Sequence, residues 1–200
     1  MPIKGWIMRT LLYAVFSLLI LSQTVVAADK IAAEEILKST LNRVFEVLQK
    51  EDLEQQAKNK EVDEIITPMF DFARMAKLSL GKKHWPGLTK EKKDRFTELF
   101  VNRLRKLYLN KLTTYTDEAI IYEPPVEVKK KIHIPTRLIS KGKEISMLYK
   151  FYSSNNNWKI YDIEIQGVSI IRSYRSQFNE ILQRGTMDDL FDKMEESIHN

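Results

Sequence analysis

Residues Asn155 to Leu182 read N-N-N-W-K-I-Y-D-I-E-I-Q-G-V-S-I-I-R-S-Y-R-S-Q-F-N-E-I-L, and the spacing of their apolar residues changes once along the way. The three asparagines predict a turn, and Trp158 to Ile165 alternates as a strand does. Gly167 interrupts that strand, and from Val168 the apolar residues recur every three or four positions. A strand therefore passes directly into a helix, which Gly185 is expected to end.

Two more strands are predicted upstream, where apolar and polar residues alternate. The first begins at Ile120, is interrupted at Pro124-Pro125, and continues as a single strand from Val126 to Ile134. After a turn at Lys141-Gly142-Lys143, the next strand places on one face Ile145, Met147, Tyr149 and Phe151. The strand from Trp158 has two apolar faces, with Trp158 and Ile160 on one and Tyr161, Ile163 and Ile165 on the other.

Helical periodicity dominates the chain before these strands. Ile31 to Leu48 is an amphipathic helix, and a second, shorter helix leads to Thr67-Pro68, where Thr67 should cap a third helix ending at Gly81. Thr89 should cap the longest helix, from Lys90 to about Thr114. Four helices, an antiparallel meander and two helices predict an α+β fold. We expect a curved antiparallel or mixed sheet of about four strands, with helices packed on its apolar face.

The first 27 residues have the composition of a secretory signal peptide. Lys4 and Arg9 are basic, Leu11 to Leu21 is apolar, and V-V-A-A precedes Asp29, so cleavage is expected after Ala27 or Ala28. The alternative is a membrane anchor, but about 11 strongly apolar residues are few against the roughly 20 of a spanning helix. Residues 28–200 are then a single domain of ordinary size.

Composition excludes several functional classes. The chain has no cysteine, which excludes disulfides, thiol redox chemistry, thiolate metal sites and a lipid-acylated N-terminus. Loss of Lys4 and Arg9 with the signal peptide lowers the formal charge from +5 to +3. An excess this small in an exported protein does not indicate binding to nucleic acid.

Two clusters of like charge stand out from this balance. Basic residues bracket one turn and acidic residues crowd the C-terminal tail: Lys82, Lys83, Lys90, Lys92 and Lys93 form the first cluster, and Asp188, Asp189, Asp192, Glu195 and Glu196 the second. Each cluster is either a solvated face or, for the lysines, a surface that docks on anionic lipid or an acidic partner.

The residues that enzymes use are scarce. The three histidines have no metal-ligand spacing, G-x-S-x-G is absent, and the six glycines form no phosphate loop, so neither metal nor cofactor is expected. Asp162 lies between apolar strand neighbours, which suits either acid-base catalysis or the acceptance of structural hydrogen bonds. Tyr174 lies on the apolar face of its helix, where core or cavity wall is the simpler role.

Two stretches resemble the MlaC family of periplasmic phospholipid carriers, also known from toluene tolerance. One is W-K-I-Y-D-I-E-I-Q-G-V-S-I-I-R-S-Y-R-S-Q-F, followed by G-T-M-D-D-L, and the other is T-P-M-F-D-F-A-R-M-A-K-L-S-L-G-K-K-H-W from Thr67 to Trp85. The likeness spans roughly Ile31 to Leu190 and departs from the family at Arg172-Ser173, where asparagine is expected. It implies a monomer in the periplasm that moves phospholipid between the outer and inner membranes and maintains outer-membrane lipid asymmetry. Its implied partners are an MCE-domain ABC transporter, an outer-membrane lipoprotein-porin complex and, transiently, the membrane surface.

The same resemblance implies that a groove between sheet and helices holds the acyl tails, with the headgroup outside. From the residues alone, the long and aromatic apolar side chains either pack completely or line such a space. The expected lipid-binding residues are Phe72, Met75, Phe100, Leu104, Tyr108, Val128, Ile132, Met147, Tyr149, Phe151, Ile163, Ile165 and Tyr174. Two alternatives stay open: a periplasmic adaptor whose apolar face binds another protein, and a lipid or glycan hydrolase that uses Asp162.

Overall fold

The computed structural model of the 200-residue chain describes residues 29–109, 119–140, 142–155 and 157–199. The predicted signal peptide, the end of the long helix near Thr114 and Lys141 of the predicted turn lie outside these ranges. The first helices span residues 29–48, Gln55–Ile66 (α2), Phe72–His84 (α3) and Lys90–Leu104 (α4). The 3₁₀ turns Thr67–Met69 (η1) and Trp85–Gly87 (η2) join α2 to α3 and α3 to α4, and the π-helical turn Arg105–Leu109 (η3) extends the end of α4.

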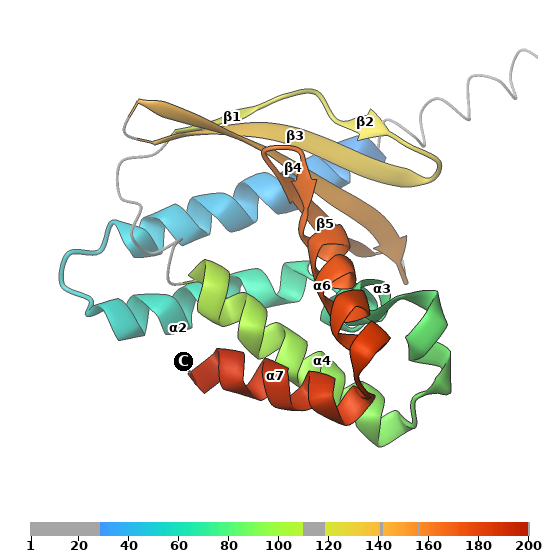
Figure 1. The fold of residues 1–200 in the computed structure, drawn as a ribbon. Helices are drawn as coiled ribbons and strands as arrows, with labels where there is room; N and C mark the ends of the chain where they lie inside the picture. Colours follow the sequence, from blue (N-terminus) through green and yellow to red (C-terminus); the bar gives the residue numbers. More distant parts are fainter. Residues whose placement is uncertain (1–28, 110–118, 141, 156, 200) are drawn as a thin grey trace, which may run out of the picture.

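The strands follow, and two helices end the described chain. The strands are Ala119–Tyr122 (β1), Val126–Glu127 (β2), Lys131–Ser140 (β3), Lys143–Ser154 (β4), Asn157–Ile165 (β5) and Val168–Ser169 (β6), and the helices are Ile170–Arg184 (α6) and Met187–His199 (α7). All pairings between strands are antiparallel, in the order β1-β3-β4-β5-β6, with β2 also on β3. The sheet lies on one side of the molecule and the helices lie on the other (Figure 1). The α+β prediction is confirmed, with six described strands in place of about four.

One of the extra strands arises because a predicted strand folds back on itself. Val126 and Glu127 pair with His133 and Ile132, so this stretch is a hairpin rather than a single strand. Its turn places Lys129 and Lys130 at φ 56° and 50°. Turns of this kind favour glycine or asparagine, so two lysines carry no sequence signal for the reversal.

A β-bulge corrects the predicted faces of β5. Lys150 pairs with Asp162 but the next residue, Phe151, pairs with Ile160, which leaves Tyr161 without a partner across the ladder. The extra residue shifts by one position which face of the sheet each side chain points to, so residues before the bulge face the opposite side from the one that strict alternation predicts. Trp158 and Ile160 therefore join the apolar face of the sheet together with Ile163 and Ile165, while the Tyr161 hydroxyl lies 3.3 Å from His133 Nε2 on the outer face.

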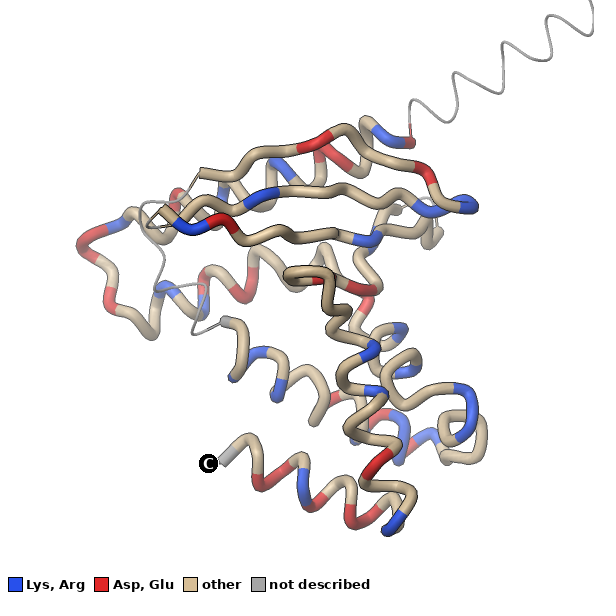
Figure 2. Tube along the Cα trace, turned by 45° about the horizontal axis from the view of Figure 1, so that its top comes forward, with Lys and Arg blue, Asp and Glu red and all other residues tan. Residues whose placement is uncertain are grey.

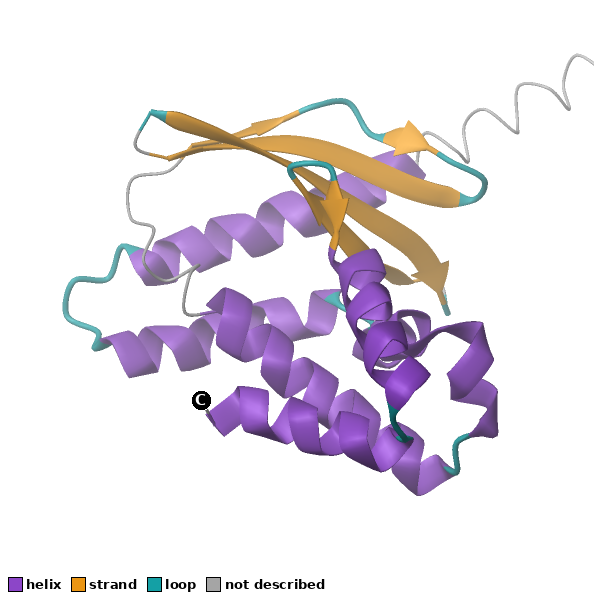
Figure 3. Ribbon diagram, in the orientation of Figure 1, coloured by secondary structure: helices purple, strands orange, loops and turns teal. Residues whose placement is uncertain are grey.

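The core lies between that apolar face and the helices, which form two layers in Figure 3. Its aromatic centre comes from α4 and α6. The rings of Phe100 and Tyr174 meet edge to face at 5.2 Å, and those of Phe96 and Phe178 do so at 5.4 Å. Such pairs favour a single arrangement of the two helices, beyond the area that they bury.

Helix caps were predicted at Thr67 and Thr89, with different outcomes. Thr89 Oγ1 accepts a hydrogen bond from Lys92 N at 3.3 Å at the start of α4, which confirms that cap. The cap of α3 is instead Asp71, which accepts from Arg74 N at 2.9 Å, because the chain first makes the 3₁₀ turn at Pro68. Helical geometry in α3 breaks at Gly81, whose φ is 82°, close to the predicted end.

The two charge clusters meet across α4 and α7. Lys92 Nζ lies 3.1 Å from Asp188, and Arg95 lies 2.7 Å from Glu195. Figure 2 shows acidic residues along α7 beside basic residues of α4. Exposed pairs of this kind stabilise a fold only slightly, because water screens their charges. The acidic tail therefore partly neutralises the basic turn that the sequence singled out.

Candidate functional site

A cavity of about 470 Å³ lies between the apolar face of the sheet and the helices. This volume falls within the roughly 300 to 1,000 Å³ that is typical of ligand pockets in proteins. Most of its lining is apolar, and the lining residues are Leu41, Asp63, Ile66, Met69, Phe70, Phe72, Met75, Leu104, Arg105, Tyr108, Leu138, Ile145, Met147, Tyr149, Ile163, Ile165, Val168, Ile170 and Ser173. A space of this composition suits an apolar ligand.

The sheet wall of the cavity follows from strand alternation. Met147 and Tyr149 project from β4 and are paired with Ile165 and Ile163 of β5, so four large apolar side chains stand side by side. The Tyr149 hydroxyl donates to Met147 Sδ at 3.6 Å. Burial raises the pKa of Tyr149, so its hydroxyl stays neutral at physiological pH.

The helical wall comes from several helices, among them α3 and the end of α4. Phe72 and Met75 lie one turn apart on α3. At Arg105 the α4 helix widens into the π-helical turn, which brings both Arg105 and Tyr108 to the cavity. Such turns are rare and often occur at functional sites. Tyr108 is half-buried, and this burial raises its pKa.

A few polar groups belong to the lining, and its charged side chains are partly exposed. Val168 of the lining is 61% exposed, and the same lining holds an ion pair in which Arg105 Nε donates to Asp63 Oδ1 at 2.7 Å. The two side chains are 38% and 24% exposed, so the ion pair lies at the rim rather than deep in the cavity. Ser173 of α6 adds a hydroxyl to the same lining. The cavity thus has an apolar interior and a charged rim.

Eight of the thirteen predicted lipid-binding residues line this cavity, and their contact with lipid stays a prediction. They are Phe72, Met75, Leu104, Tyr108, Met147, Tyr149, Ile163 and Ile165. The other five lie elsewhere. Phe100, Ile132, Phe151 and Tyr174 are buried in the packed core, and Val128 is 40% exposed beside the β2–β3 turn. Periodicity identifies the apolar face of an element but not which part of that face is covered.

Several lining residues had no place in the prediction. Ile145 continues the alternation of Met147 and Tyr149, so its position was already visible in the sequence. Asp63 and Arg105 are 42 positions apart and read as ordinary charges on helical surfaces. Only the packing of α2 against η3 brings them together.

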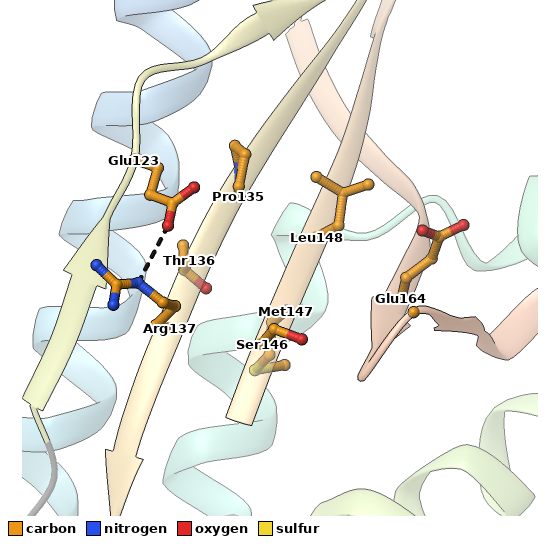
Figure 4. Close-up of a pocket in the computed structure, with 9 residues that line it drawn as sticks. Glu123, Pro135, Thr136, Arg137, Ser146, Met147, Leu148 and Glu164 are labelled. Atoms are coloured by element: carbon orange, nitrogen blue, oxygen red, sulfur yellow. Dashed lines mark ion pairs between the residues drawn. The ribbon is translucent and has the colours of Figure 1, made fainter. Parts of the chain in front are cut away.

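The outer face of the sheet carries a second, smaller hollow of about 240 Å³ (Figure 4). Its labelled residues come from β3, β4, β5 and the β1–β2 connection, and Arg137 Nε lies 3.0 Å from Glu123. Arg137 also lies 3.4 Å from Glu144. Both carboxylates already form ion pairs with Arg137. The charged groups at the hollow therefore stabilise the outer face of the sheet.

Asp162 occupies a structural position on that outer face. Its carboxylate accepts hydrogen bonds from Ser169 Oγ at 2.8 Å, from Ile171 N at 3.2 Å and from Lys150 Nζ at 3.2 Å. Two of these donors belong to the start of α6, so Asp162 ties the strand to the helix N-terminus, where a negative charge is stabilising. It does not line the apolar cavity.

Two further properties of the described residues concern metal ions and membranes. Among residues 29–109, 119–140, 142–155 and 157–199, no group of three or more histidine, aspartate or glutamate side chains could hold a metal ion. Within the same ranges, no helix has the length and hydropathy needed to cross a bilayer.

Comparisons with known proteins bear on the fold and the family of this chain. The toluene tolerance protein ttg2D of Pseudomonas putida is 24% identical over 129 residues, which are 64% of this chain and 60% of that protein. A phospholipid-binding protein from Ralstonia solanacearum, solved in complex with a phospholipid, matches with a TM-score of 0.76 at 23% identity, over 84% of this chain and 97% of that one. This structural likeness shows a shared fold. The model of the MlaC protein family matches residues 38–196, well over half of the sequence, and the chain therefore belongs to the MlaC family.

Proposed function

We propose that this protein is a periplasmic, non-enzymatic carrier that moves phospholipid between the outer and inner membranes and so maintains outer-membrane lipid asymmetry. The observation that carries this proposal is the apolar cavity of about 470 Å³ between sheet and helices. Its size and lining suit hydrocarbon, and its open end leaves room for a polar headgroup outside. Family membership supports the same ligand class.

The energetics of transfer fit such a role. Two acyl chains carry roughly 30 methylenes, and at about 0.8 kcal/mol each their removal from water is worth roughly 24 kcal/mol. A bilayer offers the same stabilisation, so a carrier needs only to match it. Release then requires the helices to part from the sheet, an opening that contacts with a partner would favour.

The route of the protein and its partners belong to the same proposal. The predicted signal peptide would direct residues 28–200 to the periplasm as a monomer. The partners would be an MCE-domain ABC transporter at the inner membrane and a lipoprotein-porin complex at the outer one, with transient contact to membrane surfaces. Lys82 and Lys83 remain candidates for such contacts, whereas Lys92 is paired with Asp188.

The hydrolase alternative receives little support from Asp162, because three donors hold its carboxylate on the sheet face away from the cavity. The experiment that tests the proposal is mass spectrometry of a solvent extract of the purified protein. It should be combined with transfer of labelled phospholipid between vesicles. Co-purified phospholipid and protein-dependent transfer are expected. An empty protein that retains a tight protein partner would favour the adaptor, and lipid breakdown that an Asp162→Asn variant loses would favour the hydrolase.

A further inference from the structure

The rim of the cavity carries an ion pair that the binding of hydrocarbon does not explain. Asp63 and Arg105 are the charged members of the cavity lining among the described residues. Charges at an apolar cavity lower its affinity for hydrocarbon, because each must give up water when the cavity is filled. Their presence therefore points to a polar part of the ligand at this place.

The guanidinium of Arg105 has donors to spare. Its Nε donates to Asp63, while within the described residues its two Nη groups donate no hydrogen bond. A guanidinium can give two parallel hydrogen bonds to a phosphate, a geometry that lysine cannot reproduce. At 38% exposure, the side chain is reachable from solvent yet borders the cavity.

Asp63 is placed to hold Arg105 when the cavity contains no ligand. The carboxylate also accepts from Thr67 Oγ1 at 3.5 Å, at the end of α2. Asp63 therefore keeps a partner if Arg105 turns toward a competing anion. Arg105 is the first residue of the π-helical turn, which follows the regular α4 helix.

We propose that Arg105 binds the phosphate of the phospholipid whose acyl chains fill the cavity, and that Asp63 pairs with Arg105 as a competing anion until that phosphate displaces it. This inference rests on the proposed function and adds to it a contact for the polar part of the ligand. It predicts little discrimination among phospholipid headgroups, because the phosphate is common to them. It also predicts a marked preference for phospholipid over a two-chain lipid that has no phosphate.

The test uses vesicles that contain phosphatidylethanolamine and diacylglycerol with identical acyl chains. Mature protein is incubated with the vesicles and separated from them, and the two bound lipids are quantified. The ratio of phosphatidylethanolamine to diacylglycerol should fall about tenfold in Arg105→Gln, the loss expected for one partly exposed charge-assisted interaction. Arg105→Lys should recover part of the ratio, since it keeps the charge but not the fork.

Lys106→Gln is the matched control. Lys106 lies on the same turn, but its Nζ donates to the carbonyls of Ser197 and Ile198 in α7, at 3.3 and 3.0 Å. This variant loses the same charge and should keep the wild-type lipid ratio. A second variant, Asp63→Asn, removes the competing carboxylate and should keep or raise the ratio. A lower ratio in Asp63→Asn would overturn the assignment without reliance on Arg105→Gln.

The remaining outcomes separate the sources of failure. If wild-type protein takes up neither lipid, the carrier function itself fails. If it takes up both lipids but Arg105→Gln leaves their ratio unchanged, or lowers the uptake of both equally, the phosphate contact fails while the carrier stands. Excess inorganic phosphate at constant ionic strength should leave the wild-type ratio unchanged. A loss of the preference under that condition would assign the site to free phosphate and overturn the lipid contact.

Discussion

Met147→Trp adds about six non-hydrogen atoms to a side chain that lines the cavity next to Tyr149 and Ile165. Because the space of about 470 Å³ lies in front of this position, the indole should enter the cavity without displacing the sheet or the helices. We expect the free energy of unfolding of the lipid-stripped protein to change by less than about 1 kcal/mol. If the added atoms displace about four methylenes of bound lipid, the gross loss is about 3 kcal/mol, or roughly a hundredfold in retention.

Phe151→Trp is the matched control on the same face of β4. Phe151 is fully buried in the packed core and is not among the residues that line the cavity. Overpacking there should cost about 1 to 3 kcal/mol. In a domain of this size each kcal/mol lowers the melting temperature by about 2 to 4 °C, so a fall of roughly 2 to 12 °C is expected.

The assay measures two quantities on each variant: phospholipid per protein after purification, and the thermal midpoint after the lipid is stripped. Met147→Trp should bind less phospholipid and keep its thermal midpoint. Phe151→Trp should instead show a lower thermal midpoint. A destabilised Met147→Trp with wild-type lipid content would refute the reasoning, because Met147 would then belong to a packed core.

Three further predictions concern stability and processing. Asp162→Asn removes the carboxylate that accepts from Ser169 Oγ and Ile171 N at the start of α6, and it should cost about 2 to 4 kcal/mol in chemical denaturation, with bound lipid per folded protein unchanged; an unaltered unfolding free energy would contradict this structural role. Thr89→Ala should cost about 1 kcal/mol, seen as a midpoint lower by a few degrees, and Thr89→Ser should restore it. The intact mass of the periplasmic protein should correspond to a chain that begins at Ala28 or Asp29, and membrane-bound protein that retains residues 1–26 would contradict cleavage.

Local sequence signals account for the elements and their order. The change of period near Gly167 predicts the passage from β5 and β6 into α6, and Gly185 follows the last residue of that helix. The alternation of Met147, Tyr149 and Phe151 predicts the inward face of β4. Such signals succeed because periodicity and caps depend on neighbours within a few residues.

Backbone features that depend on distant partners were missed. The β2–β3 turn at Lys129-Lys130 and the bulge at Tyr161 change which residues face the core, and neither has glycine or proline to mark it. Asp71 replaces Thr67 as the cap of α3, and its carboxylate also accepts a hydrogen bond from the hydroxyl of Tyr152 in β4. These conformations are held by contacts across the sheet and are therefore absent from local preference.

The division between cavity wall and packed core was decided by the tertiary structure. Met147 and Phe151 have the same pattern in the sequence, yet one borders a cavity and the other is enclosed by helices. Hydrophobic periodicity reports that a side chain leaves water, but not whether protein atoms or an empty space will meet it. The Asp63–Arg105 pair has the same origin, since two charges 42 positions apart become neighbours only when α2 and η3 pack together at the rim of that space.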